Sequence, residues 1–114
     1  MTIEDIAEHS FVDEINDLEV ESFCQQEKIT PDAFMDRFAQ HIVTGYLAGR
    51  FAWPSCDAAM NRLNRLFFKY RRYHGYAFDA FLAFETGENR QEGKTPDEIV
   101  RPWIDKLISK YPVR

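Results

Sequence analysis

The side chains best suited to metal binding or nucleophilic catalysis are three histidines and two cysteines, spread along a chain of 114 residues. No histidine stands in an HExxH pattern or at another spacing typical of a metal site. A histidine and a cysteine could act as base and nucleophile only if they met in space, and any chain of this composition offers such pairings. We therefore expect no metal site, no cofactor and no catalytic role for His9, His41, His74, Cys24 and Cys56.

Patterns for phosphate binding and acid–base catalysis are also missing. The segment GYLAG, residues 45–49, lacks the lysine and hydroxyl residue of a P-loop, and it ends an expected helix instead of opening one. Carboxylates are so common in the first third of the chain that no single pair stands out as a catalytic couple. The sequence therefore predicts a protein that is not an enzyme.

The segment NRLNRLFFKYRRYHGY, residues 61–76, combines cations and rings in a chain of net charge −5. At about 100° per residue, its cations fall within roughly 80° of one another, and the apolar side chains centre roughly 120° away. We expect the rings in the core and the cations in one outer row, the basic stripe: Arg62, Arg65, Lys69 and Arg72. Nucleic-acid-binding domains are usually basic overall, and the pI here is about 5.1. Nucleic-acid binding by this stripe therefore ranks third among our hypotheses.

The N-terminal third carries the opposite charge, with eleven acidic and two basic side chains in residues 1–40. In a helix, Asp13, Asp17 and Glu21 would lie at positions i, i+4 and i+8, with Glu14 beside them. Like charges at this spacing destabilise a helix by roughly 0.2 to 0.5 kcal/mol per pair. Two explanations stay open. In the first, the acidic face needs no partner, because it pairs with the basic stripe or is solvated. In the second, it attracts a basic partner protein.

Helical signals dominate the chain, and the alternation typical of strands is nearly absent. We expect an all-α fold, a compact bundle of four to five helices forming a single domain over residues 1–114. The first expected helix covers residues 11–26, and the second covers residues 31–48 between Thr30 and Gly49. The third runs from Pro54 to a break at His74 and Gly75, and the fourth covers residues 76–86. A single turn at 96–100 precedes the last helix, residues 102–110.

Helix ends are predicted by local signals. Thr30 can cap a helix whose first position is Pro31, and Gly49 can end it. Thr95 and Glu98 form a capping box, but Pro102 should break the helix that follows. The expected core positions are Phe11, Ile15, Leu18 and Phe23 in the first helix, and Trp103, Leu107 and Ile108 in the last.

The cellular compartment is indicated by the N-terminus and by the cysteines. The first residues, MTIEDIAEHSF, are acidic where an export signal carries basic residues, and no apolar stretch approaches the roughly 18 to 20 residues needed to span a bilayer. We expect a cytoplasmic protein without membrane contact. In a reducing compartment, Cys24 and Cys56 are expected to be small buried hydrophobic residues.

Several segments resemble small bacterial toxin-immunity proteins of the colicin-like and contact-dependent-inhibition kind. EKITPDAFMDRFAQHI is similar to their opening helices, and AWPSCDAAMNRL, YAFDAFLAFETGE and VRPWIDKLI are similar to later helices of small bacterial proteins grouped near them. The resemblance implies a helical, acidic, cytoplasmic protein that binds and neutralises a cognate toxin, often a basic nuclease. It assigns no contact residues, and the basic stripe departs from its pattern.

The sequence supports one main hypothesis and one rival class. An immunity-type protein would steer a basic toxin with Asp13, Glu14, Asp17 and Glu21, while nearby exposed rings supply affinity. A helical adaptor or secretion chaperone would also be small and acidic, but it would need an exposed apolar groove. Self-association is open under either hypothesis.

Overall fold

Six α-helices and one short 3-10 helix make up the secondary structure of residues 1–112, the part of the chain that our computed structural model describes. These residues form no strand, and none of their helices is both long and apolar enough to cross a membrane. The all-α prediction is confirmed, with more helices than the expected four to five. In order they are α1 (Ile3–His9), α2 (Asp17–Glu27), α3 (Pro31–Leu47), α4 (Trp53–Lys69), α5 (Tyr76–Glu85), η1 (Thr86–Glu88) and α6 (Pro96–Lys110).

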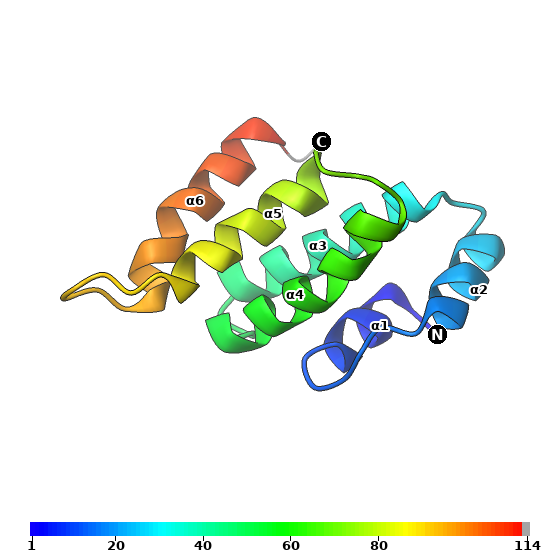
Figure 1. Ribbon diagram of the computed structural model, residues 1–114, viewed down its shortest axis with the longest axis horizontal. Helices are drawn as coiled ribbons and strands as arrows, with labels where there is room; N and C mark the ends of the chain where they lie inside the picture. Colours follow the sequence, from blue (N-terminus) through cyan, green and yellow to red (C-terminus); the bar gives the residue numbers. More distant parts are fainter. Residues whose placement is uncertain (113–114) are drawn as a thin grey trace.

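Three helices, α3, α4 and α5, form the centre of the bundle (Figure 1). α1 and α2 lie at one end, where both pack on α3, and α6 packs along α5 at the other end. The molecule is elongated, with extents of 46 × 30 × 26 Å. The acidic N-terminal region and the C-terminal helix therefore occupy opposite ends of the molecule.

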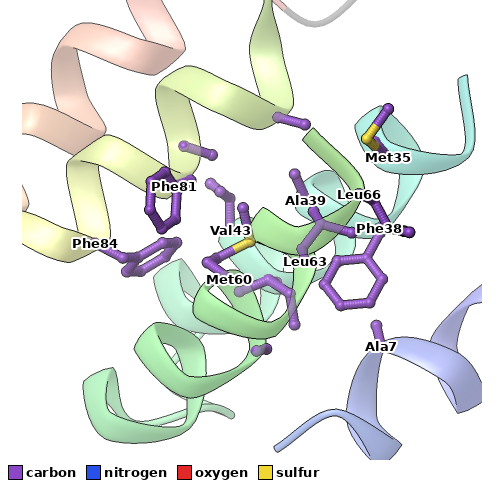
Figure 2. Packing of buried hydrophobic residues seen from close by; sticks show 14 of the residues in the cluster. Ala7, Met35, Phe38, Ala39, Val43, Met60, Leu63, Leu66, Phe81 and Phe84 are labelled. Carbon is purple, nitrogen blue, oxygen red and sulfur yellow. The ribbon is translucent and has the colours of Figure 1, made fainter. Parts of the chain in front are cut away.

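The core joins the central helices to α1. Phe38 of α3 and Leu63 and Leu66 of α4 are fully buried. Figure 2 shows Ala7 of α1 beside the Phe38 ring, with Phe84 of α5 on the far side of the cluster. Burying a large apolar side chain contributes about 1.5 to 3 kcal/mol, so this cluster is the main source of stability. All six α-helices contribute side chains to it.

Most helix ends lie where local signals predict them. Thr30 accepts a hydrogen bond from the backbone N–H three residues later, and Pro31 occupies the first helical position. Gly49 has the left-handed φ of 75° that ends α3. Thr95 and Glu98 form the predicted capping box at the start of α6. These ends depend on residues three or four positions apart, which is why the sequence alone is sufficient to find them.

The N-terminal region is wrongly predicted as one helix over residues 11–26. α1 begins after Thr2, which forms a capping box with Asp5, and it ends at Ser10. The Ser10 side chain is buried and donates to a carbonyl one turn earlier, so it terminates a helix instead of starting one. α2 begins after Asn16, whose side chain accepts from two backbone N–H groups. Residues 10–16 form the connection between the two helices.

This connection changes which side chains face the core. Ile15 and Phe23 are buried as predicted, and Phe11 is half-buried against the ring of Phe51. Leu18 was expected in the core, but 72% of it is exposed. The reason is the new start of α2, which places Leu18 in the first turn on the outer side of the helix.

The predicted break at Pro102 is also wrong, because α6 runs without interruption from Pro96 to Lys110. A proline here removes the hydrogen bond that its N–H would give to the carbonyl of Glu98. Both residues are exposed, so water can hydrate that carbonyl. The helix continues because its capping box and buried face together outweigh the loss of one hydrogen bond.

The core prediction for α6 is correct for Leu107 and wrong for two neighbours. Trp103 is 48% exposed and Ile108 is 39% exposed. α6 packs on α5 and η1 at the edge of the bundle, so only a narrow face of it is covered. Trp103 and Ile108 border that face on opposite sides. An edge helix thus leaves part of its apolar surface open.

Replacing Pro102 with alanine should stabilise the protein. Pro102→Ala restores a helical hydrogen bond on an exposed surface, and the loss of a rigid residue from the unfolded chain offsets only part of the gain. We expect the free energy of unfolding in urea to rise by roughly 1 to 2 kcal/mol. Pro96→Ala is the matched control at the first helical position, where proline is favourable, and it should give no gain. Equal effects of the two variants would contradict this account.

Candidate protein interface at the N-terminal end

The basic stripe of α4 holds the connection between α1 and α2. Arg62 donates a hydrogen bond of 2.7 Å to the carbonyl of Ser10, and Arg65 donates one of 2.6 Å to the carbonyl of Ile15. Residues 10–16 have no regular ladder of backbone hydrogen bonds, so these carbonyls need partners of another kind. The two arginines supply them and thereby fix the path of the connection.

The same cations form ion pairs with the acidic residues of α2 and its approach. The carboxylate of Asp17 lies 2.6 Å from Arg65 and 3.4 Å from the ammonium of Lys69. The Arg65 guanidinium holds the pKa of Asp17 below its ordinary value. Two longer pairs flank this centre, Lys69 with Glu21 at 3.8 Å and Arg62 with Glu14 at 3.7 Å. Three of the four acidic candidates thus pair within the molecule.

Asp13 stands apart from the other acidic candidates. It lies in the bend before α2, and its carboxylate is 3.6 Å from the ring of His9. The predicted series of carboxylates at i, i+4 and i+8 on one helix therefore does not form. Only Asp17 and Glu21 share a helical face, and Lys69 contacts both of them. The repulsion expected from the sequence is neutralised by α4.

Arg72 is not part of the stripe, which corrects the sequence prediction. α4 ends at Lys69, and Arg71 adopts a left-handed φ of 53° that turns the chain away. Arg72 instead donates to Asp32 at 2.9 Å and to Asp36 at 3.2 Å on α3. The other oxygen of Asp36 accepts the backbone N–H of Ala77 in the first turn of α5. Arg72 and Asp36 therefore have a structural role where α3 meets the start of α5.

The rings of the segment 61–76 are also divided differently from the prediction. Phe67 is fully buried, as expected, and Tyr70 is half-buried. Phe68 is 75% exposed and Tyr73 is 51% exposed. Phe68 follows Phe67 by 100°, so a helix that buries one of them must turn the other outward. The aromatic residues of this stretch are therefore not all core residues.

A surface with exposed apolar side chains lies around the start of α2. Its apolar members are Met1 and Leu18, which are 68% and 72% exposed. Leu18 and Glu19 line two adjoining hollows of about 510 and 320 Å³. Carboxylates surround them, and we call the whole the N-terminal surface: Met1, Asp13, Glu14, Leu18 and Glu19. Leu18 is the ridge between its two hollows.

Sequence reasoning found the charge of this surface and missed its apolar part. Leu18 fits the apolar spacing of a helix that begins at Phe11, and it was assigned to the core for that reason. The signal that could have corrected this is Asn16, a strong N-cap residue followed by an acidic first turn. A helix that starts after Asn16 has Val20, Phe23 and Cys24 as its buried set, and these are the residues buried in α2.

The contacts and burial of His41 and the two cysteines are those of residues that support the fold. His41 lies 3.1 Å from Glu8 and links α3 to α1. Cys24 and Cys56 are both buried and unpaired, as predicted, and burial raises the pKa of the Cys56 thiol to about 12. Within residues 1–112, no group of three or more histidine, cysteine, aspartate or glutamate side chains is arranged to hold a metal ion.

One carboxyl group away from the N-terminal surface has a strongly perturbed pKa. Burial on α4 raises the pKa of Asp57 from 3.8 to about 7, and the neighbouring Glu88 and Glu85 add to the shift. Asn61 opposes it by a hydrogen bond to the carboxyl group. Asp57 therefore gains a proton on folding at mildly acidic pH and links the stability of the α4–η1 contact to pH.

These contacts define a helical bundle whose acidic end is partly neutralised by its own basic stripe and keeps an apolar, acidic surface beyond it. Comparison of the chain with protein-family models, with curated proteins and with solved structures finds no match. The N-terminal surface exposes apolar side chains within a rim of carboxylates.

Reversing the charge of Asp17 should weaken the fold more than reversing that of Glu19. Both residues lie in the first turn of α2 and interact alike with the helix dipole, but only Asp17 forms ion pairs. We expect Asp17→Lys to lower the free energy of unfolding by about 1 kcal/mol more than Glu19→Lys, a value reduced by solvent screening. Urea titrations at low salt measure the difference, and 1 M salt should shrink it. Equal losses would contradict a stabilising role for the pairs.

Stability should depend on pH through Asp57. Because the folded state raises this pKa, it binds the proton more tightly than the unfolded chain does. The free energy of unfolding should therefore fall as pH rises from about 4 to about 7 and level off above that. Asp57→Asn should flatten this slope and stabilise the protein at pH 8 by roughly 1 kcal/mol, because the group is partly exposed. Glu92→Gln in the exposed loop is the control, and an unchanged slope in Asp57→Asn would refute the assignment.

Proposed function

We propose that this chain is a non-enzymatic, cytoplasmic protein-binding domain of the immunity type, which binds and neutralises a cognate bacterial toxin. The observation that carries the proposal is the N-terminal surface, where Leu18 is 72% exposed and stands between two hollows. Exposed apolar residues that cluster within a charged rim are typical of protein interfaces. The toxin itself is inferred from the resemblance of the helical segments to immunity proteins.

The charge of this end favours a basic partner. Residues 1–27 contain nine carboxylates and no lysine or arginine. The basic stripe pairs with three of them, and Glu4, Glu19 and Glu27 form no ion pair within residues 1–112. A surplus of one sign raises the rate at which an oppositely charged protein associates. A basic toxin domain fits this surplus.

The apolar residues would supply affinity once the partner is in place. Charged rims mainly affect association rates, whereas a few buried side chains carry most of the binding energy. Leu18 offers a side chain that is 72% exposed in the unbound protein. The acidic candidates of the sequence therefore change role. Asp13 and Glu14 form a rim, and Asp17 and Glu21 hold the surface in position.

Of the two rival functions, a structural feature supports the adaptor or chaperone, and the contacts of the basic stripe disfavour nucleic-acid binding. A helical adaptor or secretion chaperone requires an exposed apolar groove, and such a groove lies between α5 and α6. Nucleic-acid binding through the basic stripe would use cations that already bind carboxylates and backbone carbonyls. Their positive potential is correspondingly reduced, so the stripe has little charge left for phosphate.

The decisive experiment tests neutralisation of a toxin. A pull-down from the native organism identifies the partner, and co-expression with the toxin's C-terminal domain should restore growth. We expect Leu18→Ala to weaken binding at least tenfold, about 1.4 kcal/mol, with an unchanged melting temperature. The association rate of the two proteins should fall as the salt concentration rises. Leu82→Ala, an exposed leucine on α5, is the matched control and should bind normally.

Two results would contradict the proposal. A captured toxin domain that still kills co-expressing cells would exclude the immunity function. Equal binding by Leu18→Ala and Leu82→Ala would show that the N-terminal surface is not the contact, even if neutralisation occurs.

A further inference from the structure

α5 and α6 lie side by side at the end of the molecule opposite α1 and α2 (Figure 1). A groove between these two helices forms a second surface. The hollow has a volume of about 190 Å³ and is lined mainly by apolar side chains, with two lysines on its rim. We call it the α5–α6 groove, and its residues are Asp79, Leu82, Ala83, Trp103, Lys106, Leu107 and Lys110. Nothing in the N-terminal surface depends on it.

The groove exposes side chains that a bundle of this size would ordinarily cover. Trp103 is 48% exposed and Leu82 is 43% exposed, and they come from neighbouring helices. A tryptophan can bury 150 to 250 Å² of surface, and tryptophan is among the residues most enriched at the centres of protein interfaces. The two side chains thus offer an apolar contact to a partner.

The Trp103 ring is held in place before any partner arrives. The ammonium of Lys106 lies 4.6 Å from the centre of the ring, one helical turn away. Trp103 lies in the middle of α6, which runs unbroken from Pro96 to Lys110. Ordering a side chain on binding has an entropy cost, and a ring that is already ordered avoids most of it.

The charge of the groove is positive where a partner would meet it. Asp79 is the one acidic residue of its lining, and its carboxylate already accepts from Lys110 at 2.9 Å and from the Tyr111 hydroxyl at 2.8 Å. Lys106 forms no ion pair within residues 1–112. An approaching segment therefore meets an uncompensated ammonium beside the indole, which repels cations and attracts carboxylates.

A larger hollow on the other side of α6 does not share these features. It has a volume of about 670 Å³ and contains Arg72 and Asp36, which bind each other. The two terminal nitrogens of Arg72 are occupied by Asp32 and Asp36, and its buried Nε has no hydrogen-bond partner within residues 1–112. The α5–α6 groove combines a ring in cation–π contact with a lysine that forms no ion pair within residues 1–112.

We propose that the α5–α6 groove binds an amphipathic, acidic segment of a partner protein, which places an apolar side chain against Trp103 and Leu82 and a carboxylate against Lys106. This goes beyond toxin neutralisation, because the partner has the opposite charge from the one that fits the N-terminal surface. A second copy of this chain is the competing occupant, since its own N-terminal surface is acidic and exposes Leu18. Such a contact would join unlike surfaces and extend into open chains.

The test uses two labelled synthetic helical peptides that differ only in charge. One carries leucine and glutamate on one face, and the other carries leucine and lysine at the same positions. Fluorescence anisotropy with the full chain should show binding of the glutamate peptide alone. Trp103→Ala and Lys106→Glu should each weaken it at least tenfold. Lys94→Glu, an exposed lysine in the loop before α6, is the charge-matched control and should bind normally.

The remaining outcomes each overturn the proposal. Equal binding of both peptides would show that charge does not select the occupant, and equal losses in Lys106→Glu and Lys94→Glu would show that Lys106 is not the contact. If the glutamate peptide does not bind, the groove does not bind acidic segments. If the protein's own molecular mass rises with concentration and this rise is lost in Trp103→Ala, the occupant is a second copy of the chain. Leu18→Ala must keep full peptide binding, which separates this result from the toxin hypothesis.

Discussion

The rotation of α4 about its own axis is the constraint on which the rest of the molecule depends. Leu63, Leu66 and Phe67 are fully buried between α3 and α5, and this fixes where every other side chain of the helix points. Arg62 and Arg65 must then face the connection between α1 and α2. One apolar face thus determines both the core and the position of the acidic N-terminal region.

The sequence was sufficient for features that depend on near neighbours. Thr30 and Thr95 start helices because their side chains reach backbone groups three residues away, and Gly49 ends one by its own conformation. It was insufficient where the outcome depended on distant partners. Asp17 and Arg65 are 48 positions apart, and their pairing follows from how two helices dock. Trp103 has the spacing of a core residue, but whether it is covered depends on α6 lying at the edge.

The molecule separates its charges along its length, and this separation is consistent with more than one kind of partner. At the N-terminal end, carboxylates exceed cations even after the basic stripe has bound three of them. At the other end, Lys106 forms no ion pair within the described residues 1–112 and lies over an exposed ring. A protein with a uniform surface could not select partners of opposite charge. Here the N-terminal surface combines a small apolar contact with excess carboxylates, whereas the α5–α6 groove combines one with two lysines and a single carboxylate.

The way in which α4 holds the N-terminal connection also has a consequence for the order of folding. The contacts from Arg62 to Ser10 and from Arg65 to Ile15 join residues 52 and 50 positions apart, so each closes a long loop. Closing such a loop costs chain entropy, which is repaid only after α3 and α4 have formed and packed. We therefore expect the acidic segment to dock late in folding. Although it is synthesised before the central helices, it should reach its final position only after they have packed.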